Sequence, residues 1–378
     1  MKREKIKILH VTFNMGIGGT ERVILQLING LDSDCYECSI LCIDGEIGSI
    51  GNSLQEKGIQ IISYNRKDGF DASLILYLHR LIKQQQFNVL HCHQYTPYFY
   101  GALSSIFTKC KVIFTEHGRF YPDRYSWKRR IINQILYLTT DSITTISKAT
   151  KDALIRYEWM PKKAISVIYN GIEPAQCSSQ TYELKKELRI NEEDLLLGTI
   201  SRLDPVKNQK MMIDAFYEVN KAKANTKLLI VGDGPSRERL EKHAIKLKLD
   251  NSVIFTGFQT SPDEYLALMD VFLLSSFTEG TSISLLEAMS LGKPSVLTDV
   301  GGNSEVIDNG THGFLTQSND VLQFSDKILT LLMDNNLRAK LGDNSKVRFL
   351  NTFGIKIMID TYQQLYQKLA NDTSGYHH

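Results

Sequence analysis

The stretch from Ser275 to Gly302 reads SSFTEGTSISLLEAMSLGKPSVLTDVGG, and it predicts the fold class of the chain. The apolar run at 271–274, just before it, has the length and composition of a buried strand. A polar loop, a helix that begins near residue 283 and a second buried strand at 295–298 follow. This order of elements is typical of a parallel α/β sheet.

The loop and the start of this helix form a predicted anion site. Thr281 and Ser282 are hydroxyl residues that suit a helix N-cap. Gly292 and Pro294 are expected to end the helix. The first amides of a helix have no acceptor within it, and the helix dipole favours negative charge there. We therefore expect a phosphate group at this helix end. The apolar face comprises Ile283, Leu285, Leu286, Ala288 and Met289.

Two carboxylates, Glu279 and Glu287, flank the predicted anion site, with seven residues between them. A carboxylate cannot serve to bind phosphate, but it can accept hydrogen bonds from hydroxyl groups such as those of a sugar and a ribose. The alternative is that both glutamates merely complement the helix dipole.

At this point the sequence resembles the retaining glycosyltransferases of family 4, which have the GT-B fold and use nucleotide-sugars. Their E-x7-E motif matches Glu279 and Glu287, within an EG…LLEA…G.P…D.GG frame. Thr281-Ser282 departs from the family, where many relatives carry a bulky residue followed by glycine. This departure changes side chains and should keep the backbone amides. The resemblance implies a catalytic role for Glu279, and donor contacts for Glu279, Gly280, Thr281, Ser282, Ile283 and Glu287.

The composition is that of an ordinary globular chain. It has 378 residues, 42% hydrophobic and 23% charged, enough for two domains. The net charge of +2 argues against a dedicated nucleic-acid binder. Apolar runs are far below transmembrane length. The apolar run at 6–13 includes His10 and leads into glycines, so it predicts a first strand rather than a signal peptide. We expect a cytoplasmic protein.

The six cysteines predict no metal site. Cys35 and Cys38 form a C-x2-C, but no second such pair follows at zinc spacing. His91, Cys92 and His93 look like ligands, yet adjacent residues of a strand point to opposite faces. We expect ordinary thiols in a reducing cytoplasm.

Predicted strands and helices alternate along the chain in two cycles, with the second cycle beginning near residue 195. The predicted architecture is α/β, with two doubly wound Rossmann-like domains facing each other across a cleft. The polar stretch 173–194 is the expected linker. The expected domains are an acceptor-side domain at 1–175, a nucleotide-sugar domain at 176–353 and a C-terminal helix at 354–378 that, as in the family, crosses back to the first domain.

A glycine loop follows the first strand and comprises Gly16, Gly18 and Gly19. A dehydrogenase is the competing class, but Glu21 stands where G-x-G-x-x-G needs a glycine. The family typically has GG-x-E-R-V here, which matches residues 18–23. Such a loop lets the backbone approach the donor phosphates and the acceptor.

Arg202 and Lys207 lie in the loop after the first strand of the second cycle, in S-R-L-D-P-V-K-N-Q. They resemble the phosphate-binding pair of the family. Two fixed cations would stabilise the charge that develops on a leaving nucleoside diphosphate, so the transfer could proceed without a divalent metal.

His117 follows the strand at 111–116, in T-E-H-G. In the resembling family a histidine at this place contacts the donor sugar near the reacting centre, so we expect a catalytic role. Gly232 and Gln259 are expected to shape the base pocket through their backbone, which does not distinguish uracil from guanine.

The segment 118–130 contains five basic residues, four aromatic residues and one acid. Aromatic residues mixed with lysine and arginine are typical of a membrane interface or a phosphorylated acceptor. A solvated loop is the alternative. The acceptor or membrane candidates are Arg119, Arg124, Trp127, Lys128, Arg129 and Arg130.

The sequence thus predicts a metal-independent glycosyltransferase without a cofactor. It would move a hexose from a nucleotide-sugar, a UDP-sugar by expectation, to a glycan or lipid-linked acceptor in cell-surface polysaccharide or glycolipid synthesis. Retention of configuration is implied by the resemblance. The basic segment adds an expected peripheral position at the cytoplasmic face of the inner membrane. The alternatives are a nucleotide-sugar epimerase of the same fold (UDP-N-acetylglucosamine 2-epimerase type) and a non-catalytic nucleotide-binding module.

Overall fold

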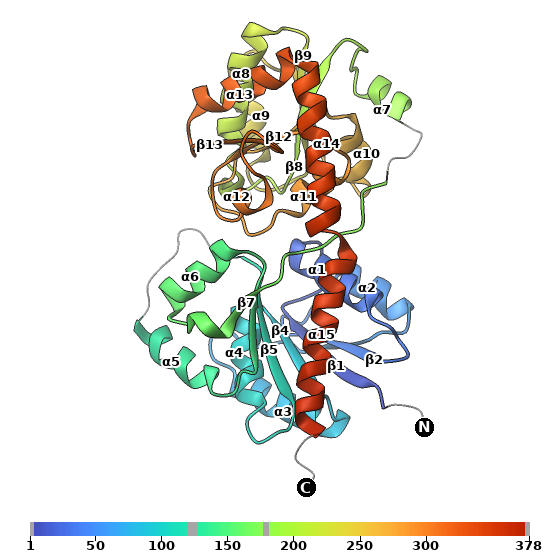
Figure 1. Cartoon of the computed structure of the whole chain (residues 1–378), viewed down its shortest axis with the longest axis vertical. Helices are drawn as coiled ribbons and strands as arrows, with labels where there is room; N and C mark the ends of the chain where they lie inside the picture. Colours follow the sequence, from blue (N-terminus) through green and yellow to red (C-terminus); the bar gives the residue numbers. More distant parts are fainter. Residues whose placement is uncertain (1–3, 119–126, 177–180, 375–378) are drawn as a thin grey trace. The chain divides into compact units, whose positions relative to one another are not determined.

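The computed structural model describes residues 4–118, 127–176 and 181–374. The chain divides into two compact units, the first made of 1–171 with 355–378 and the second of 172–354. Each unit is built around one parallel sheet with helices on both faces (Figure 1). The predicted pair of doubly wound α/β domains is confirmed.

The sheet of the first unit has seven strands in the order β3-β2-β1-β4-β5-β6-β7. Its central strands are buried on both faces, as in a covered parallel sheet. The strands are β1 (Ile6–Thr12), β2 (Tyr36–Cys42), β3 (Gln60–Ser63), β4 (Val89–His93), β5 (Lys111–Glu116), β6 (Ser142–Thr145) and β7 (Ile165–Val167). The helices are α1 (Gly19–Gly30), α2 (Ser49–Glu56), α3 (Ala72–Gln85), α4 (Tyr95–Ser104), α5 (Trp127–Tyr137), α6 (Lys148–Glu158) and α15 (Ile355–Ser374).

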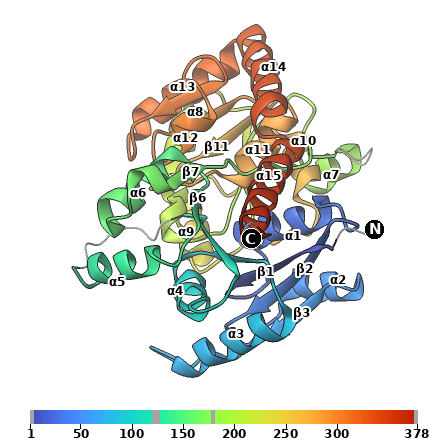
Figure 2. The ribbon, with the colours of Figure 1, turned by 60° about the horizontal axis from the view of Figure 1, so that its bottom comes forward.

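The two faces of this sheet are covered by different helices. Leu9, Val11 and Leu90 point to one face, where α3 and α4 form the larger core. Ile8 and Val89 point to the other, where α1 and the late helix α15 pack against them. Figure 2 shows α3 and α15 on opposite sides of the strands. A helix from the end of the described chain therefore completes the core of the first unit.

The sheet of the second unit has six parallel strands in the order β10-β9-β8-β11-β12-β13. The strands are β8 (Leu195–Ile200), β9 (Thr226–Val231), β10 (Val253–Gly257), β11 (Val271–Leu274), β12 (Ser295–Thr298) and β13 (Gly313–Thr316). The helices are α7 (Thr181–Glu187), α8 (Gln209–Ala222), α9 (Arg237–Lys246), α10 (Pro262–Leu268), α11 (Ile283–Ser290), α12 (Asn303–Val306), α13 (Val321–Met333) and α14 (Asn335–Thr352), with a short 3-10 turn, η2, at Pro205–Lys207.

The strand order of this second sheet reverses between β8 and β11. The chain runs outward from β8 through β9 to β10, and then returns to the other side of β8 through β11. In open parallel sheets, ligands bind beyond the carboxyl ends of the strands at such a switch point. The loops after β8 and β11 are therefore the place to look for a site.

The polar stretch 173–194 was predicted to be a linker, and this prediction is wrong for its second half. Helix α7 forms there and packs on α10. Leu184 and Ile190 are buried within the second unit. Two buried apolar residues, one within α7 and one just after it, anchor a segment whose overall composition is polar.

Candidate active site

The candidate site of the second unit lies on the loops after β8 and β11, on both sides of the switch point. The first loop carries Arg202 and Lys207, and the second carries Glu279. The start of α11 follows the second loop directly. The residues that the sequence singled out from two distant stretches thus belong to one edge of one sheet.

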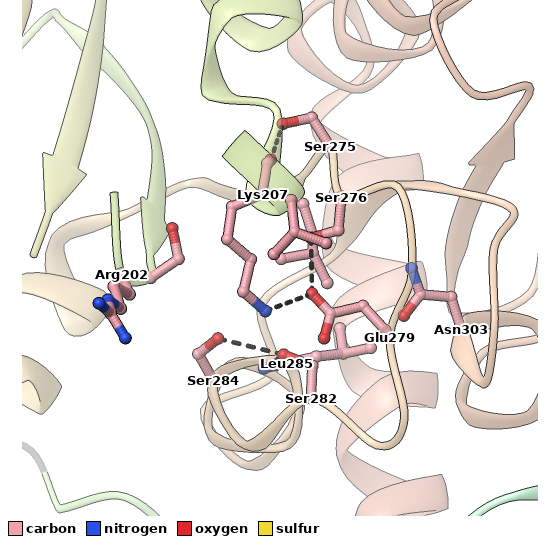
Figure 3. Close-up of polar contacts among 12 residues, drawn as sticks. Arg202, Lys207, Ser275, Ser276, Glu279, Ser282, Ser284, Leu285 and Asn303 are labelled. Carbon is pink, nitrogen blue, oxygen red and sulfur yellow. Dashed lines mark hydrogen bonds and ion pairs between the residues drawn. The ribbon is translucent and has the colours of Figure 1, made fainter. Parts of the chain in front are cut away.

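Lys207 and Glu279 form an ion pair at the centre of this site. The Lys207 Nζ lies 2.7 Å from Glu279 Oε1, and the Ser276 hydroxyl donates to the same oxygen at 2.6 Å (Figure 3). The Glu279 side chain is only 7% exposed and that of Lys207 24%. Because the pair is largely shielded from water, its charges interact more strongly than those of a surface pair.

The two loops are also tied together through their backbones. The Ser275 hydroxyl donates to the carbonyls of Lys207 and Asn208, each at 3.0 Å. The Phe277 amide donates to the Val206 carbonyl at 2.8 Å. These bonds fix the position of the Lys207 side chain before any ligand binds, which preorganises a cation in the site.

Helix α11 begins as the sequence predicted. Ser282 is the N-cap, and its hydroxyl accepts from the Leu285 amide at 3.4 Å. The neighbouring hydroxyl of Ser284 lies 3.2 Å from that of Ser282. The other amides of the first turn have no acceptor within the helix, so together with the dipole they favour an anion here. Thr281 and Glu287 are buried beside this helix end.

The loop after β12 supports Glu279 from the other side. The Gly302 amide donates to the Glu279 carbonyl at 3.0 Å. Gly301 adopts a φ of +53°, and a Cβ added to it would lie 2.0 Å from that carbonyl oxygen. Only glycine allows the two backbones to approach this closely. The final glycines of the opening stretch thus hold the backbone at Glu279.

Arg202 lies apart from the ion pair. Its side chain is 74% exposed, and its Nε lies 3.9 Å from the Asp204 carboxylate, a weak surface contact. Figure 3 shows its guanidinium away from Lys207 and Glu279. The structure therefore brings Lys207 and Glu279 together and leaves Arg202 at the rim of the site.

The residues predicted to shape the base pocket lie on the loops after β9 and β10. Gly232 is in close contact with the loop after β8, since an added Cβ would lie 2.1 Å from the Ser201 carbonyl. Gln259 donates from its amide nitrogen to the Thr256 carbonyl at 3.0 Å. Both contacts shape loops beside the site, so a base-binding role for either residue stays a prediction.

In the first unit, the glycine loop leads from β1 into α1. Gly18 is the N-cap of α1 and offers no side-chain cap, while Gly19 is the first helical residue. The Gly16 amide donates to the Asn14 side chain at 3.0 Å. His117 follows β5 and donates to or accepts from His93, with His117 Nε2 2.8 Å from His93 Nδ1.

Among the described residues, His10, His91 and His93 gather closely enough to be considered as metal ligands. His91 and His93 are two residues apart on β4, so they share a face, and His10 joins them from β1. The rings of His91 and His93 lie face to face at a tilt of 33°, with centroids 4.1 Å apart. Both nitrogens of His91 already contact Tyr366 and Thr115 hydroxyls. This arrangement does not fit a metal ion.

The basic and aromatic segment is described only in part. Arg119 and Arg124 lie outside the described residues, as does the side chain of Lys128. Arg129 lies in α5 and forms an ion pair with the fully buried Glu158, with 2.5 Å between Nη1 and Oε1. This pair gives Arg129 a structural partner that the sequence analysis missed. Trp127 and Arg130 are exposed on α5.

Two doubly wound units, the second with a Lys–Glu pair beside a helix start at its switch point, fit the GT-B fold. Comparison with known proteins names the family. The model of the family described as "Glycosyltransferase Family 4" matches residues 17–176, and that of "Glycosyl transferases group 1" matches residues 180–348. Together they cover most of the chain, which belongs to the group 1 glycosyltransferases of family 4.

Several known proteins are similar over most of their length. N-acetyl-alpha-D-glucosaminyl L-malate synthase of Bacillus anthracis is 29% identical over 313 residues, 80% of each chain. The UDP-Gal:alpha-D-GlcNAc-diphosphoundecaprenol alpha-1,3-galactosyltransferase of Escherichia coli is 24% identical over 377 residues, 96% of this chain and 97% of that one. The structure of HepE from Anabaena in complex with UDP matches with a TM-score of 0.85 at 20% identity, over 97% of this chain and 100% of that one.

Proposed function

We propose that this glycosyltransferase transfers a hexose from a UDP-sugar to a glycan or lipid-linked acceptor with retention of configuration, in the synthesis of a cell-surface polysaccharide or glycolipid. The observation that carries the proposal is the Lys207–Glu279 pair beside the start of α11. It sets a preorganised cation, a carboxylate and a set of helix amides side by side. A diphosphate and the hydroxyls of a sugar need these three kinds of partner.

The proposed roles follow from the charges. The helix start binds the diphosphate, and Lys207 stabilises the negative charge that grows on it as the glycosidic bond breaks. Glu279 accepts hydrogen bonds from sugar hydroxyls, and Glu287 from a ribose. The acceptor attacks on the face that the diphosphate leaves, and the departing phosphate oxygen takes the acceptor's proton. With Lys207 and the amides carrying the charge, we propose that no divalent metal is needed.

A UDP-sugar is favoured as the donor because of the relatives. The Escherichia coli relative uses UDP-Gal by its name, and the HepE structure holds UDP. The family resemblance supports retention, and it favours a contact between His117 and the donor sugar. A glycan or lipid-linked acceptor is favoured because the same relative acts on a sugar bound to diphosphoundecaprenol.

The donor proposal is tested by a thermal-unfolding screen with UDP, GDP, ADP and their sugars. UDP and at least one UDP-hexose are expected to raise the midpoint, since a ligand at 100 times its Kd stabilises by about 2.7 kcal/mol. The stabilising sugar is then supplied with candidate acceptors, with and without a chelator. Stabilisation by GDP or ADP alone would contradict the choice of base. Conversion of UDP-N-acetylglucosamine to its epimer without acceptor would favour the epimerase instead.

A second part of the proposal places the acceptor at an anionic membrane surface. None of the helices that the structure describes is long and apolar enough to span a membrane. Helix α5, however, exposes apolar side chains on one face. Trp127 is 70% exposed, Ile131 56% and Ile135 53%, each four residues from the next, and Leu138 follows at 83%. An exposed apolar stripe next to a basic segment is typical of a helix that lies in a membrane interface.

We expect the protein to sediment with vesicles that contain anionic lipid, and less so as salt is raised. Replacing Trp127 and Ile131 by Ser should lower vesicle binding by roughly 100-fold or more, because burial of each large apolar side chain contributes about 1.5–3 kcal/mol. Ile245→Ser is the matched control, since Ile245 is similarly exposed, at 62%, on α9 of the second unit. UDP affinity should not change. Wild-type protein that ignores such vesicles at low salt would favour a soluble acceptor.

A further inference from the structure

Three buried imidazoles form a hydrogen-bonded chain within the first unit. Nδ1 of His10 lies 3.0 Å from Nε2 of His93, and Nδ1 of His93 lies 2.8 Å from Nε2 of His117. The residues come from three neighbouring strands, since His10 is on β1, His93 ends β4 and His117 follows β5.

The two outer nitrogens of this row of three histidines are in similar surroundings. Nε2 of His10 and Nδ1 of His117 are both buried, and neither has a hydrogen-bond partner among the described residues. His10 and His93 are fully buried, and His117 is partly so. Burial lowers the pKa of His10 and of His117 to about 3, and it lowers the pKa of His93 well below its usual value. All three rings are therefore neutral at physiological pH.

Neutrality restricts where the protons can be. Three neutral imidazoles have three N–H groups and three lone-pair nitrogens. Each of the two hydrogen bonds uses one N–H and one lone pair, so a single N–H and a single lone pair are left for the two ends. If His117 carries its proton on Nε2, then His93 carries its proton on Nε2 and so does His10. If His117 carries it on Nδ1, the other two rings carry theirs on Nδ1 as well.

We propose that His93 and His10 are positioning residues for sugar transfer, which hold the His117 ring and fix whether its Nδ1 donates or accepts a hydrogen bond. The inference rests on the proposed function, in which His117 contacts the donor sugar. A sugar hydroxyl that binds Nδ1 of His117 then finds this nitrogen fixed either as a hydrogen-bond donor or as an acceptor. Through the His93 ring, the position of the proton on His10 depends on the tautomer of His117.

The same region of the sheet supplies an internal control, His91. It lies on the same face as His93, with its ring in contact with that of His93, and it is equally buried. Its hydrogen bonds, however, go to Tyr366 and Thr115 at 2.7 Å each, and none joins it to the chain of three. A role that depends only on filling the core would be shared by His91 and His93. Of these two residues, only His93 can link His10 to His117 through hydrogen bonds.

Two substitutions of His93 separate its two hydrogen bonds. Asn places an amide near the position of Nδ1 and can keep the contact with His117, whereas Gln places it near Nε2 and can keep only the contact with His10. We expect His93→Gln to lower turnover by roughly 10- to 100-fold, the usual loss when a residue that orients a functional histidine is removed. His93→Asn should recover part of this loss, and His91→Asn should turn over like the wild type. UDP affinity should be unchanged in all three.

The tautomers are read directly in the full-length protein by 15N–1H correlation spectra of histidine-labelled samples. The expected result for the wild type is that His10, His93 and His117 all carry the proton on the same type of nitrogen, and that His93→Gln uncouples His117 from His10. Different tautomers along the wild-type chain, or wild-type turnover in His93→Gln, would overturn the inference. If some variant fails to fold, the wild-type spectrum still decides. If the three tautomers are coupled but the protein has no transferase activity, the proposed function is wrong, whereas the hydrogen-bonded coupling of the three histidines is still confirmed.

Discussion

Replacing Lys207 by Ala is expected to lower turnover by roughly 100-fold or more, the scale seen when one preorganised charge-stabilising group is removed. The ammonium group is fixed by Glu279 and by the loop bonds of Ser275, so its loss removes charge stabilisation from the position where a leaving diphosphate becomes negative. Nucleotide binding should weaken as well. Steady-state kinetics with the donor found by the thermal screen, and calorimetry with UDP, measure the two effects.

Lys210→Ala is the matched control. Lys210 lies in the first turn of α8, three residues after Lys207, and it pairs with Asp214 at 2.7 Å on the exposed surface rather than with Glu279. Its removal should leave turnover near the wild-type value. Lys207→Ala also leaves the buried Glu279 carboxylate without its ion-pair partner, which lowers the stability of the fold. Adding Glu279→Gln should therefore restore stability without restoring turnover. Unchanged binding of UDP, GDP and ADP by Lys207→Ala would show that Lys207 does not contact the nucleotide.

Gly301→Ala is expected to reduce turnover by roughly 100-fold, because a displacement of about 1 Å at a reacting group can cost that much. The methyl group would lie 2.0 Å from the Glu279 carbonyl oxygen, so the loop after β12 must move away. The bond from the Gly302 amide to that carbonyl would then break, and Glu279 would lose its support. Kinetics under saturating donor, together with the thermal midpoint, check this result.

Gly310→Ala separates the clash from the backbone strain. Gly310 has a φ of +77°, also in the left-handed region, but an added Cβ meets nothing within 4 Å. Both variants have the conformational cost of alanine at positive φ, about 1 kcal/mol or somewhat more. Only Gly301→Ala should also lose turnover. Equal kinetics for the two variants would mean that Gly301 does not position the site.

The fold could be predicted from the sequence because its signals are local. Apolar runs of strand length, the Ser282 cap and the turn at Gly292, which has a φ of +68°, all lie within a few residues of the element they define. These predictions are confirmed. The linker prediction for 173–194 failed because it used average polarity, whereas α7 is held by a few apolar residues such as Leu184.

The contacts within the site could not be predicted, because they depend on strand order. Lys207 and Glu279 are 72 residues apart, and nothing local indicates that they pair. Likewise, alternation along β4 places His91 and His93 on one face, but only the position of β1 beside β4 brings His10 to them. Arg129 and Arg130 look alike in the sequence, and the difference between them is the buried Glu158 on α6.

The return of α15 to the first unit has a consequence for biosynthesis. Tyr362 and Tyr366 of this helix are buried against the strands of the first sheet and contact Thr115 and His91 there. On the ribosome, all seven strands of that sheet emerge before the second unit, but this helix emerges only after it. Until then, α1 covers part of that face, and the rest of the face is without its native partner. The second unit, which is continuous in sequence, can reach its native state first.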